Sequence, residues 1–439
     1  MRLTILGGSS PFTTNMFTEG RAARFLGGFR HITLYGRDRR SLELVRGRII
    51  PEVGRATLAV TTDLAEALCG ADVVLVQLRY GGLALRRLIE ETCYSHGLFA
   101  DESLGVGGLA TALCVQGAWR GLGNRLHHDC PAALTVNMIN PLSLSSQLLQ
   151  DSGARTIGLC EGPLTTARQL AAHLCGPEET FDWDCAGLNH RAFVYDIRLG
   201  GRPLPFAALA DLPLPRACGV ADPQSGALIS KEMAQARSPA DWTYGRAETV
   251  ARMRAGALKG LAAPTEGGAA PEAAAEAAAG ARRPTPWYDD AVLPLLAAWS
   301  GWSDPFDTTI NHPVEGLFLE SRFCIGKTSL TPRHRASARA TQPRAIAETV
   351  AALVQHERAV LACLELAWQQ RDPASGGPPS DAVFVALTDA MASALAADPL
   401  IPEAQKPVAL VALREIIARY RDMEQRPAQG ATTACGIPG

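Results

Sequence analysis

The chain has 439 residues, of which 47% are hydrophobic and 20% are charged, as in an ordinary soluble globular protein. This length is sufficient for a large core and for two lobes. The formal net charge is −2. Because so small a charge gives no general attraction to nucleic acid or to an anionic membrane, we expect neither as a partner.

The sequence also carries no obvious targeting signal. No basic segment is followed by an apolar run of signal-peptide type, and no run of about 18 apolar residues indicates a membrane span. Eleven cysteines are scattered without a C-x-x-C pair, which favours reduced thiols over a disulfide framework. We therefore expect a cytoplasmic protein.

A Gly-rich turn follows the first predicted strand, residues 1–6. The turn is Gly7-Gly8-Ser9-Ser10 and it precedes a predicted helix. At this place in an α/β fold, backbone N–H groups bind the pyrophosphate of a dinucleotide. The G-x-G-x-x-G pattern is incomplete, so an ordinary tight turn stays an alternative.

The second predicted strand, residues 31–36, leads to the residues that select NAD or NADP. Asp38 follows it and could hold the ribose hydroxyls, as an acid does in NAD sites. Arg37, Arg39 and Arg40 could instead attract the 2′-phosphate of NADP. A solvated basic helix start explains the same residues equally well, so we expect NAD and leave NADP open.

Residues 71–78 form a continuous apolar run, which is typical of a parallel strand buried on both faces. Ligands of open parallel sheets bind beyond the carboxyl ends of the strands. Arg79 and Arg86 follow this run. We expect Arg79 at the cofactor and Arg86 at the substrate, with surface arginines of a helix as the alternative.

A second Gly-rich loop is predicted at residues 101–108, and a further strand at residues 132–136. Asn137 and Asn140 lie at the end of that strand. The amide of Asn137 is suited to binding sugar hydroxyls or cofactor. An Asx turn or a helix cap explains one of the two asparagines equally well.

Two later strand-like runs each end in a pair of polar residues. The first delivers Cys160 and Glu161, and the second, residues 181–187, delivers Asn189 and His190. A thiol and an imidazole, each beside a polar neighbour, suit one divalent ion that also holds substrate oxygens. A buried free cysteine and a structural histidine are the alternatives.

The patterns predict an α/β protein with two lobes. We expect a Rossmann-type parallel sheet in a dinucleotide-binding domain, residues 1–195, and a mostly helical α+β lobe with a small mixed sheet, residues 196–425, for substrate binding and oligomerisation. Residues 262–285 are rich in Ala, Gly, Pro and Glu and indicate a mobile insertion. Residues 426–439 indicate a loose tail.

Within the second lobe, residues 287–299 indicate an amphipathic helix. Residues 308–313 and 317–321 predict two strands of a small sheet. Residues 345–368 and 381–421 are rich in Ala and Leu and predict two long helices.

In this order, the motifs resemble glycoside hydrolase family 4, which includes NAD- and metal-dependent α-galactosidases, 6-phosphoglycosidases and α-glucuronidases. The resemblance covers most of the chain, and the cysteine and histidine behind a Rossmann start are its most specific part. The residues that carry it are Gly7-Gly8-Ser9-Ser10, Arg79-Tyr80-Gly81-Gly82, Gly105-Val106-Gly107-Gly108, Asn137 to Pro141, Gly158-Leu159-Cys160 and Gly187-Leu188-Asn189-His190.

The resemblance implies an NAD- and metal-dependent glycosidase-like enzyme. Such an enzyme oxidises C3 of a sugar, deprotonates C2, eliminates the C1 leaving group and adds water. It implies Cys160 and His190 as ligands of a divalent metal, for which we expect Mn, although Zn would also suit these ligands. It also implies Asn137 and Asn189 as substrate contacts and Glu161 as the acid for the leaving oxygen.

The family's base is a tyrosine, and Lys231 and Tyr244 are the candidates for its place here. A desolvated amine can act as a base near neutral pH. One alternative function is that of a sugar or cyclitol oxidoreductase or epimerase that keeps only the C3 redox step. A nucleotide-binding protein without catalysis is another. The resemblance further implies a homodimer or homotetramer.

Overall fold

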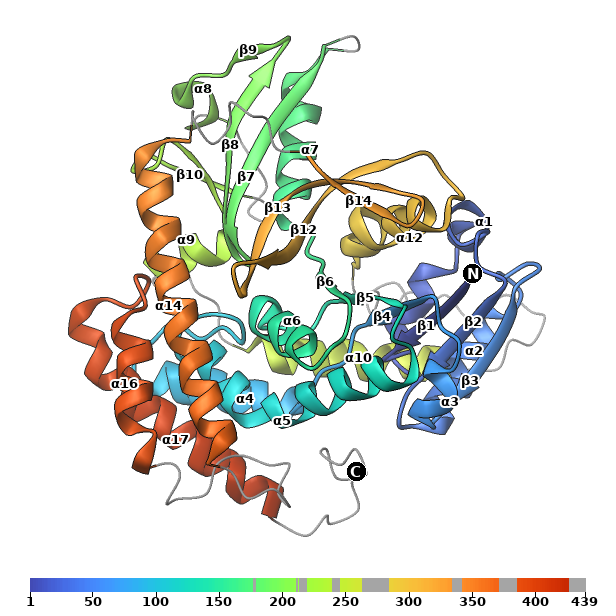
Figure 1. Ribbon diagram of the computed structural model, residues 1–439, viewed down its shortest axis with the longest axis horizontal. Helices are drawn as coiled ribbons and strands as arrows, with labels where there is room; N and C mark the ends of the chain where they lie inside the picture. The colour runs from blue at the N-terminus through green and yellow to red at the C-terminus, as the bar shows by residue number, and fades with distance from the viewer. Residues whose placement is uncertain are drawn as a thin grey trace.

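The computed structural model describes residues 1–176, 179–210, 212, 219–238, 245–262, 284–333, 342–370 and 385–425. Figure 1 shows the arrangement of its helices and strands. Almost all of the predicted insertion, the predicted tail and Tyr244 lie outside the described residues.

A nine-stranded sheet has the order β14-β13-β12-β6-β5-β4-β1-β2-β3. Strands β1 to β6 run parallel to one another, and their order, 3-2-1-4-5-6, is that of dinucleotide-binding folds. The predicted Rossmann-type sheet is therefore confirmed. Its parallel strands are β1 (Arg2–Leu6), β2 (His31–Tyr35), β3 (Thr57–Thr61), β4 (Val73–Val76), β5 (Leu134–Asn137) and β6 (Thr156–Gly158).

The continuous apolar character of β4 has a simple cause, since the strand packs on both faces. Val74 and Val76 contribute to one hydrophobic core with α4 and α5. Val73 and Leu75 contribute to a second core with α2 and α12 on the other face. The helices that cover this sheet or lie at its edge are η1 (Pro11–Met16), α1 (Arg21–Phe25), α2 (Arg39–Ile49), α3 (Leu64–Leu68), α4 (Gly82–Ser95), α5 (Gly105–Asp129), α6 (Leu142–Asp151), α7 (Gly162–Leu174), α10 (Arg246–Ala262), η3 (Tyr288–Val292) and α12 (Leu293–Ser300).

The predicted second Gly-rich loop is only partly a loop. Helix α5 begins at Gly105 and includes the glycines that follow. A Cβ atom at Gly107 would lie 2.0 Å from the carbonyl oxygen of Asp101. These glycines therefore allow the first turn of a helix to pack directly against the preceding backbone, which a loop prediction from glycine content does not foresee.

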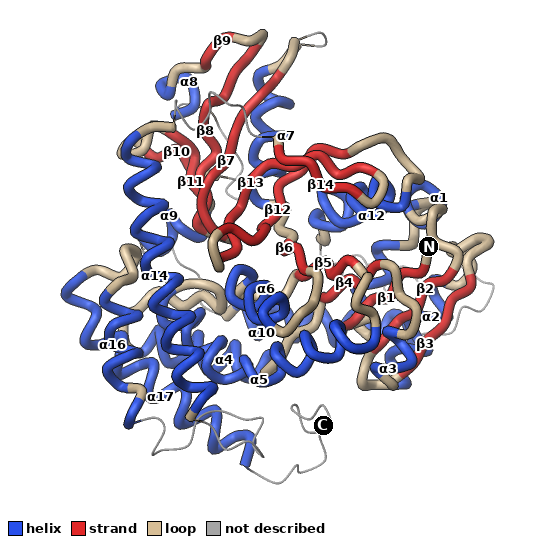
Figure 2. Tube along the Cα trace, viewed as in Figure 1, coloured by secondary structure: helices blue, strands red, loops and turns tan. Residues whose placement is uncertain are grey.

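The two strands predicted for a small separate sheet instead extend the nine-stranded one. β12 (Phe306–Val314) pairs antiparallel with β13 (Leu317–Gly326), and Asn311 of β12 pairs with Gly158 of β6. β14 (Ser329–Pro332) forms the outer edge. The C-terminal half thus places β12 directly beside the end of β6, with β13 on the far side of β12, as Figure 2 shows.

A second sheet is antiparallel and consists of β7 (Phe181–Leu188), β8 (Arg191–Leu199), β9 (Arg202–Pro203), β10 (Val220–Asp222) and β11 (Ala227–Ile229). Strand β8 begins directly after His190 and pairs antiparallel with β7. The predicted domain boundary at residue 195 falls inside this strand. Two helices accompany the sheet, α8 (Phe206–Ala210) and α9 (Lys231–Arg237).

The C-terminal helices pack against α4 and α5 through the first core. They are α14 (Arg344–Gln369), α16 (Thr388–Ala396), η4 (Glu403–Gln405) and α17 (Lys406–Gln425). The prediction of α14 is confirmed, but the prediction of one helix over 381–421 is wrong. Pro399 and Pro402 lie between α16 and α17, and a proline inside a helix removes a backbone donor.

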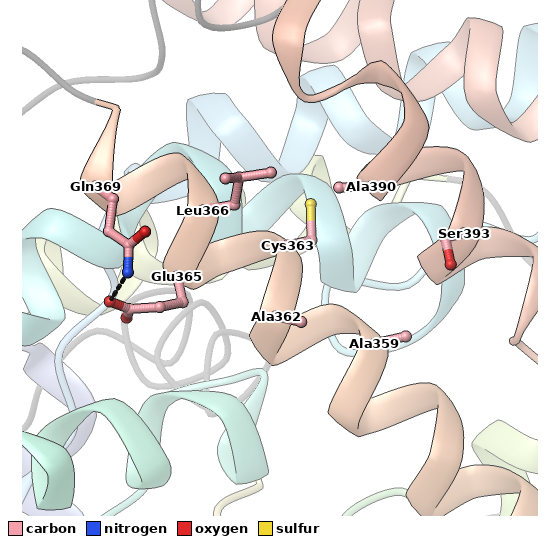
Figure 3. A pocket seen from close by; sticks show the side chains of 8 residues that line it. All are labelled: Ala359, Ala362, Cys363, Glu365, Leu366, Gln369, Ala390 and Ser393. Carbon is pink, nitrogen blue, oxygen red and sulfur yellow. Dashed lines mark hydrogen bonds between the residues drawn. The ribbon is translucent and has the colours of Figure 1, made fainter.

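Small side chains leave an apolar pocket between α14 and α16, which Ala359, Cys363 and Ala390 help to line (Figure 3). This pocket lies on helices remote in sequence from the predicted site residues. Within the described part of the chain, no helix combines the length and apolar character that a membrane crossing needs.

Gly187 is the residue of β7 that we expect to tolerate substitution least. Its φ is +134°, and a Cβ there would lie 2.4 Å from the carbonyl oxygen of Arg191. We predict that Gly187→Ala lowers the free energy of unfolding by about 2–4 kcal/mol, because backbone strain and overpacking add. Urea denaturation measures this loss.

Gly201→Ala is the matched control, since Gly201 also has a positive φ of +79° but has open space around its Cβ position. It should lose only about 1–2 kcal/mol, the strain alone. Equal losses in the two variants would contradict the packing explanation.

Candidate functional site

Five residues lie side by side across the sheet at the carboxyl end of its parallel strands. Val76, Asn137, Gly158, Asn311 and Glu320 are successive Cα partners on β4, β5, β6, β12 and β13. Directly paired residues project from the same face of a sheet. The row therefore brings Asn311 and Glu320, which belong to the C-terminal half of the chain, to the part of the sheet that contains β6, the strand that leads to Cys160.

Cys160 lies between the end of β6 and the start of α7, and Glu161 is the residue at the helix start. The Thr309 hydroxyl of β12 donates to the Cys160 carbonyl oxygen at 3.4 Å. Burial raises the pKa of the Cys160 thiol well above its ordinary value, and the charges of Glu161 and Glu320 add to this. A bound cation would act in the opposite direction and favour the thiolate.

His190 is in the turn between β7 and β8, with φ +60°. The Ser230 hydroxyl donates to its carbonyl oxygen. The next residue, Arg191, donates to Glu357 of α14 at 2.7 Å, and Ser143 of α6 donates to the other oxygen of that carboxylate. The turn is thus held from α6, α9 and α14 together.

Glu161 connects these segments electrostatically. Burial raises the pKa of Glu161, while His190 and Lys231 oppose the rise and Glu232 adds to it. Lys231 begins α9, and its Nζ lies 3.6 Å from a carboxylate oxygen of Glu232. The fold therefore gathers three predicted site residues, Glu161, His190 and Lys231.

Several polar atoms beside this cluster are buried and have no hydrogen-bond partner among the described residues. They are both amide atoms of Asn189 and Nδ1 of His190. The buried amide of Asn311 and carboxyl group of Glu320 lie within hydrogen-bond reach of each other, and this contact and one from Thr309 oppose the rise that burial causes in the Glu320 pKa. A buried polar group without a partner costs about 1–3 kcal/mol. Such a concentration of these groups at one place indicates a place for a ligand.

A single divalent ion fits this arrangement only if the chain supplies few of its ligands. Among the residues that the structure describes, no three His, Cys, Asp or Glu side chains form a group able to hold a metal ion. Cys160 and His190 would then need substrate oxygens to complete the coordination. Their assignment as metal ligands stays a prediction.

The predicted cofactor turn packs tightly against β2. The N–H groups of Gly7 and Gly8 both donate to the Tyr35 carbonyl oxygen, at 3.0 and 2.8 Å. A Cβ at Gly8 would lie 2.6 Å from Cβ of Leu34. Ser9 and Ser10, both half-buried, continue the turn toward η1.

Asp38 caps the helix that follows β2. Its carboxylate accepts from the Arg40 N–H at 3.0 Å and from the Ser41 hydroxyl at 2.5 Å. The Ser41 hydrogen bond lowers the pKa of Asp38. Contact of Asp38 with a ribose stays a prediction. In the structure, the same side chain caps the N-terminus of α2.

Arg79 and Arg86 share one partner that the sequence does not reveal. Both guanidinium groups form ion pairs with Glu102, and Arg86 also binds Glu90 at 2.8 Å. Burial opposes ionisation of Glu102, yet the charges of Arg79 and Arg86 outweigh it and lower its pKa. These contacts all lie within the protein. The predicted roles of Arg79 at the cofactor and of Arg86 at the substrate therefore stay predictions.

The amide of Asn137 is fully engaged within the protein. Its Nδ2 donates to the hydroxyls of Ser145 and Ser146 at 2.8 and 2.9 Å, and its Oδ1 accepts from the Ile139 N–H at 3.1 Å. This geometry favours a structural role. The substrate contact expected of Asn137 stays a prediction, whereas the free amide of Asn189 retains its full capacity for a ligand.

Sequence reasoning did not identify Asn311, Glu320 or Glu232. The segment around Glu320 is recognisable as a strand. A carboxylate between apolar neighbours is a weak signal, because it does not reveal which sheet the strand joins or what the side chain faces.

Comparisons with known proteins agree with this fold. Residues 3–175 match the model of the family described as Family 4 glycosyl hydrolase. Over 154 residues, or 34% of each protein, the chain is 32% identical to the 6-phospho-beta-glucosidase of Escherichia coli strain K12. Over 216 residues, or 46% of this chain and 43% of the relative, it is 27% identical to the alpha-galactosidase of Rhizobium meliloti strain 1021. The matches span less than half of each curated relative.

Two solved structures resemble the whole fold. The 6-phospho-beta glucosidase of Thermotoga maritima, solved with NAD and glucose-6-phosphate, has a TM-score of 0.72 and 18% identity, over 96% of this chain and 99% of that one. A 6-phospho-alpha-glucosidase from gut microorganisms, in complex with NAD and Mn²⁺, has a TM-score of 0.69 and 17% identity, over 97% and 98%. At such identities the likeness shows the fold.

The ion pairs of Glu102 generate a prediction about stability. Glu102→Gln leaves Arg86 buried with one partner fewer, so we expect the free energy of unfolding at pH 7 to fall by about 3 kcal/mol. Because the pKa of Glu102 is lowered by folding, its contribution is present above its ordinary pKa of 4.5 and is lost as the pH falls through the folded value. Urea denaturation between pH 7 and pH 3 measures both effects.

Glu43→Gln is the control, because Glu43 forms an exposed i,i+4 pair with Arg39 on α2. It should change stability by less than about 0.5 kcal/mol. A Glu102→Gln variant as stable as this control would show that the buried network contributes nothing.

Proposed function

We propose that this chain, whose residues 3–175 match the model of family 4 of the glycosyl hydrolases, is a member of that family and an NAD- and divalent-metal-dependent glycosidase. The observation that carries the proposal is the position of Cys160 and Glu161 just beyond the carboxyl end of β6, with His190 within electrostatic reach of Glu161 and with buried polar atoms of Asn189 and His190 that have no partner among the described residues. Ligands of such sheets bind at this end. The relatives solved with NAD and Mn²⁺ support the same two cofactors.

Each cofactor would have its own set of residues. We assign the pyrophosphate of NAD to the turn Gly7 to Ser10, which lies beyond the end of β1. The N–H groups of Gly7, Gly8 and Ser10 already donate to carbonyl oxygens of the protein, so the Ser9 N–H and the two serine hydroxyls would make these contacts. Asp38 and Arg79 would contact the rest of the nucleotide. Cys160 and His190 would hold the cation, for which we propose Mn.

When bound, NAD would supply hydride-transfer chemistry at sugar C3, and a cation held by Cys160 and His190 would supply charge to polarise the substrate there. The residues of the chain would then move protons. Glu161 adjoins Cys160 and is placed to give a proton to the leaving oxygen at C1. Asn189 would orient a hydroxyl with its unpartnered amide, and Asn137 and Arg86 are the further proposed substrate contacts.

The base that removes the C2 proton is proposed to be Lys231 or Tyr244. Lys231 lies on α9 within electrostatic reach of Glu161, so it is our first choice. Tyr244 lies outside the described residues.

A sugar or cyclitol oxidoreductase or epimerase is the second candidate, because the same residues would support C3 oxidation without elimination. A panel of glycosides with NAD and Mn²⁺ separates the two functions. A glycosidase releases the aglycone without net NADH, whereas an oxidoreductase accumulates NADH in proportion to sugar. An epimerase gives an isomeric sugar and no aglycone.

The metal assignment predicts that Cys160→Ser lowers Mn²⁺-dependent turnover by at least about 100-fold and weakens Mn²⁺ binding. Even residues that only support a metal ligand change affinity by about 10–100-fold. Turnover and the electron paramagnetic resonance signal of free Mn²⁺ provide the two measurements.

Cys175→Ser is the matched control, since Cys175 ends the same helix that Cys160 precedes. It should retain both properties. If Cys160→Ser keeps the Mn²⁺ affinity and turnover of the control, the metal assignment is wrong.

The base assignment predicts that Lys231→Met lowers kcat by about 100-fold or more, the usual contribution of a positioned base, and slows exchange of the substrate C2 proton with solvent deuterium. Tyr244→Phe tests the second candidate in the same assays. Lys259→Met, a change at an exposed residue of α10, should have no effect. If both candidates match this control, neither residue is the base.

A further inference from the structure

We propose that Glu357 of α14 is a positioning residue of the cation site, which fixes where His190 lies relative to Cys160. It acts through Arg191 and Ser143, which contact its carboxylate from two other elements. This inference rests on the proposed function, because it concerns the two residues to which that proposal assigns the cation. None of Glu357, Arg191 and Ser143 belongs to the cofactor, substrate or proton-transfer groups assigned above.

His190 and Asn189 form the whole turn of the β7–β8 hairpin. The residues on either side of them, Leu188 and Arg191, are Cα partners. His190 has a φ of +60°, which lies in the left-handed region that is unfavourable for a residue with a side chain. Such a conformation persists only where the surrounding structure holds it. The place of His190 therefore depends on the contacts that its neighbours make.

Contacts on both sides hold this turn. The hydroxyl of Ser230, which precedes α9, donates to the His190 carbonyl oxygen. On the other side, the guanidinium group of Arg191 donates to the Glu357 carboxylate at 2.7 Å. Helix α14, which carries Glu357, lies beside β7 (Figure 1). The ion pair therefore ties the residue directly after His190 to α14.

The ion pair is buried, and burial makes it better suited to fixing a position than to adding stability. The side chains of Arg191 and Glu357 are 5% and 2% exposed. Taking two charges out of water costs about as much as their attraction returns, so an apolar pair of similar volume is often as stable. The hydrogen bond between a guanidinium group and a carboxylate is directional, however. Because Nε of Arg191 has no hydrogen-bond partner among the described residues, this buried group depends on Glu357 for its place.

The other carboxylate oxygen of Glu357 connects to the segment that carries Cys160. It accepts from the Ser143 hydroxyl on α6. The same helix packs against the end of β6, since a Cβ at Gly158 would lie 3.0 Å from the hydroxyl oxygen of Ser146. Gly158 ends the strand that leads to Cys160. One carboxylate thus contacts the support of both proposed ligands.

A cation held by few protein ligands is sensitive to the distance between them. No three His, Cys, Asp or Glu side chains of the described chain form a group able to hold a metal ion, so Cys160 and His190 are the two ligands that we assign. Metal–ligand distances are fixed to within about 0.2 Å. A displaced His190 therefore lowers the affinity for the cation, because no third side chain of this kind compensates for it.

The first experiment uses the double variant Arg191→Met/Glu357→Leu, which removes both charges together and leaves neither of them buried without its partner. We expect the Mn²⁺ affinity of the NAD-loaded chain to fall by about 10–100-fold, with a thermal unfolding temperature close to that of the unchanged chain. The electron paramagnetic resonance signal of free Mn²⁺ measures the affinity. A folded double variant with unchanged Mn²⁺ affinity shows a purely structural role and overturns the proposal.

Arg120→Met/Glu365→Leu is the matched control. Arg120 of α5 and Glu365 also form an ion pair, at 2.8 Å, that joins α14 to another element. This variant should keep the Mn²⁺ affinity of the unchanged chain. An equal loss of affinity in the two double variants would show that any change on α14 disturbs the site, and this result would overturn the assignment to Glu357.

The second experiment uses Ser143→Ala, which tests the link to α6 and decides the outcome if the double variant does not fold. It removes one hydrogen bond of Glu357 and leaves the ion pair with Arg191 in place. We expect the Mn²⁺ affinity to fall by about tenfold, the lower end of the range for residues that support a metal ligand. An unchanged affinity would overturn the proposed link between the two ligand segments.

A metal-free measurement separates this inference from the proposed function. Crystal structures of the unchanged chain and of Arg191→Met/Glu357→Leu, both without metal, give the position of His190 relative to Cys160. We expect a displacement of about 0.5 Å or more, the tolerance of a functional site. If the unchanged chain binds no Mn²⁺, the metal assignment of the proposed function fails and these two structures alone decide the inference. A displaced His190 supports it, whereas an unmoved His190 overturns it.

Discussion

The pairing of Gly158 with Asn311 is the constraint on which the rest of the site depends. It joins a parallel sheet built from the first 158 residues to an antiparallel extension built from residues 306–332. A Cβ at Gly158 would lie 3.0 Å from both Cβ of Asn311 and the hydroxyl oxygen of Ser146. The absence of a side chain lets β12 and α6 approach β6 together, and the strand that leads to Cys160 is fixed between them.

Glu357 provides the second constraint, and it does so with a buried charge. Its carboxylate accepts from Ser143 on α6 and from Arg191 at the start of β8. A buried carboxylate is tolerated only when it is paired and hydrogen-bonded. Because these partners lie on different elements, the carboxylate of Glu357 links α6 and α14 to the β7–β8 turn that carries His190.

The local patterns in the sequence predicted the parallel strands well, because a strand buried on both faces needs apolar residues at every position, as in residues 73–76. The strands predicted at 308–313 and 317–321 are confirmed as β12 and β13, but the sheet they join depends on a pairing across about 150 residues. No local pattern encodes that pairing. The break in the predicted helix over 381–421 was visible at Pro399 and was overlooked.

The same distinction applies to the site. Cys160, Glu161, Asn189 and His190 were found because each follows a strand-like run, and the fold brings Glu161 and His190 within electrostatic reach of each other. The partners of the arginines were not found, because Glu102 lies 23 residues from Arg79 with no periodic relation to it. The sequence shows that an arginine is charged. Whether the arginine can bind a ligand depends on whether the fold already pairs it with a carboxylate.

This dependence has a consequence for how such a site changes specificity. In the proposed enzyme, the number of arginines available to a charged substrate would depend on the carboxylates that already pair with them. Here those carboxylates are Glu102 and Glu357. Burial raises the pKa of Glu320 to about 8, with Glu161 acting in the same direction. Glu102 and Glu357 are separate from the strand row of Asn137, Gly158 and Asn311, which positions the segment that leads to Cys160.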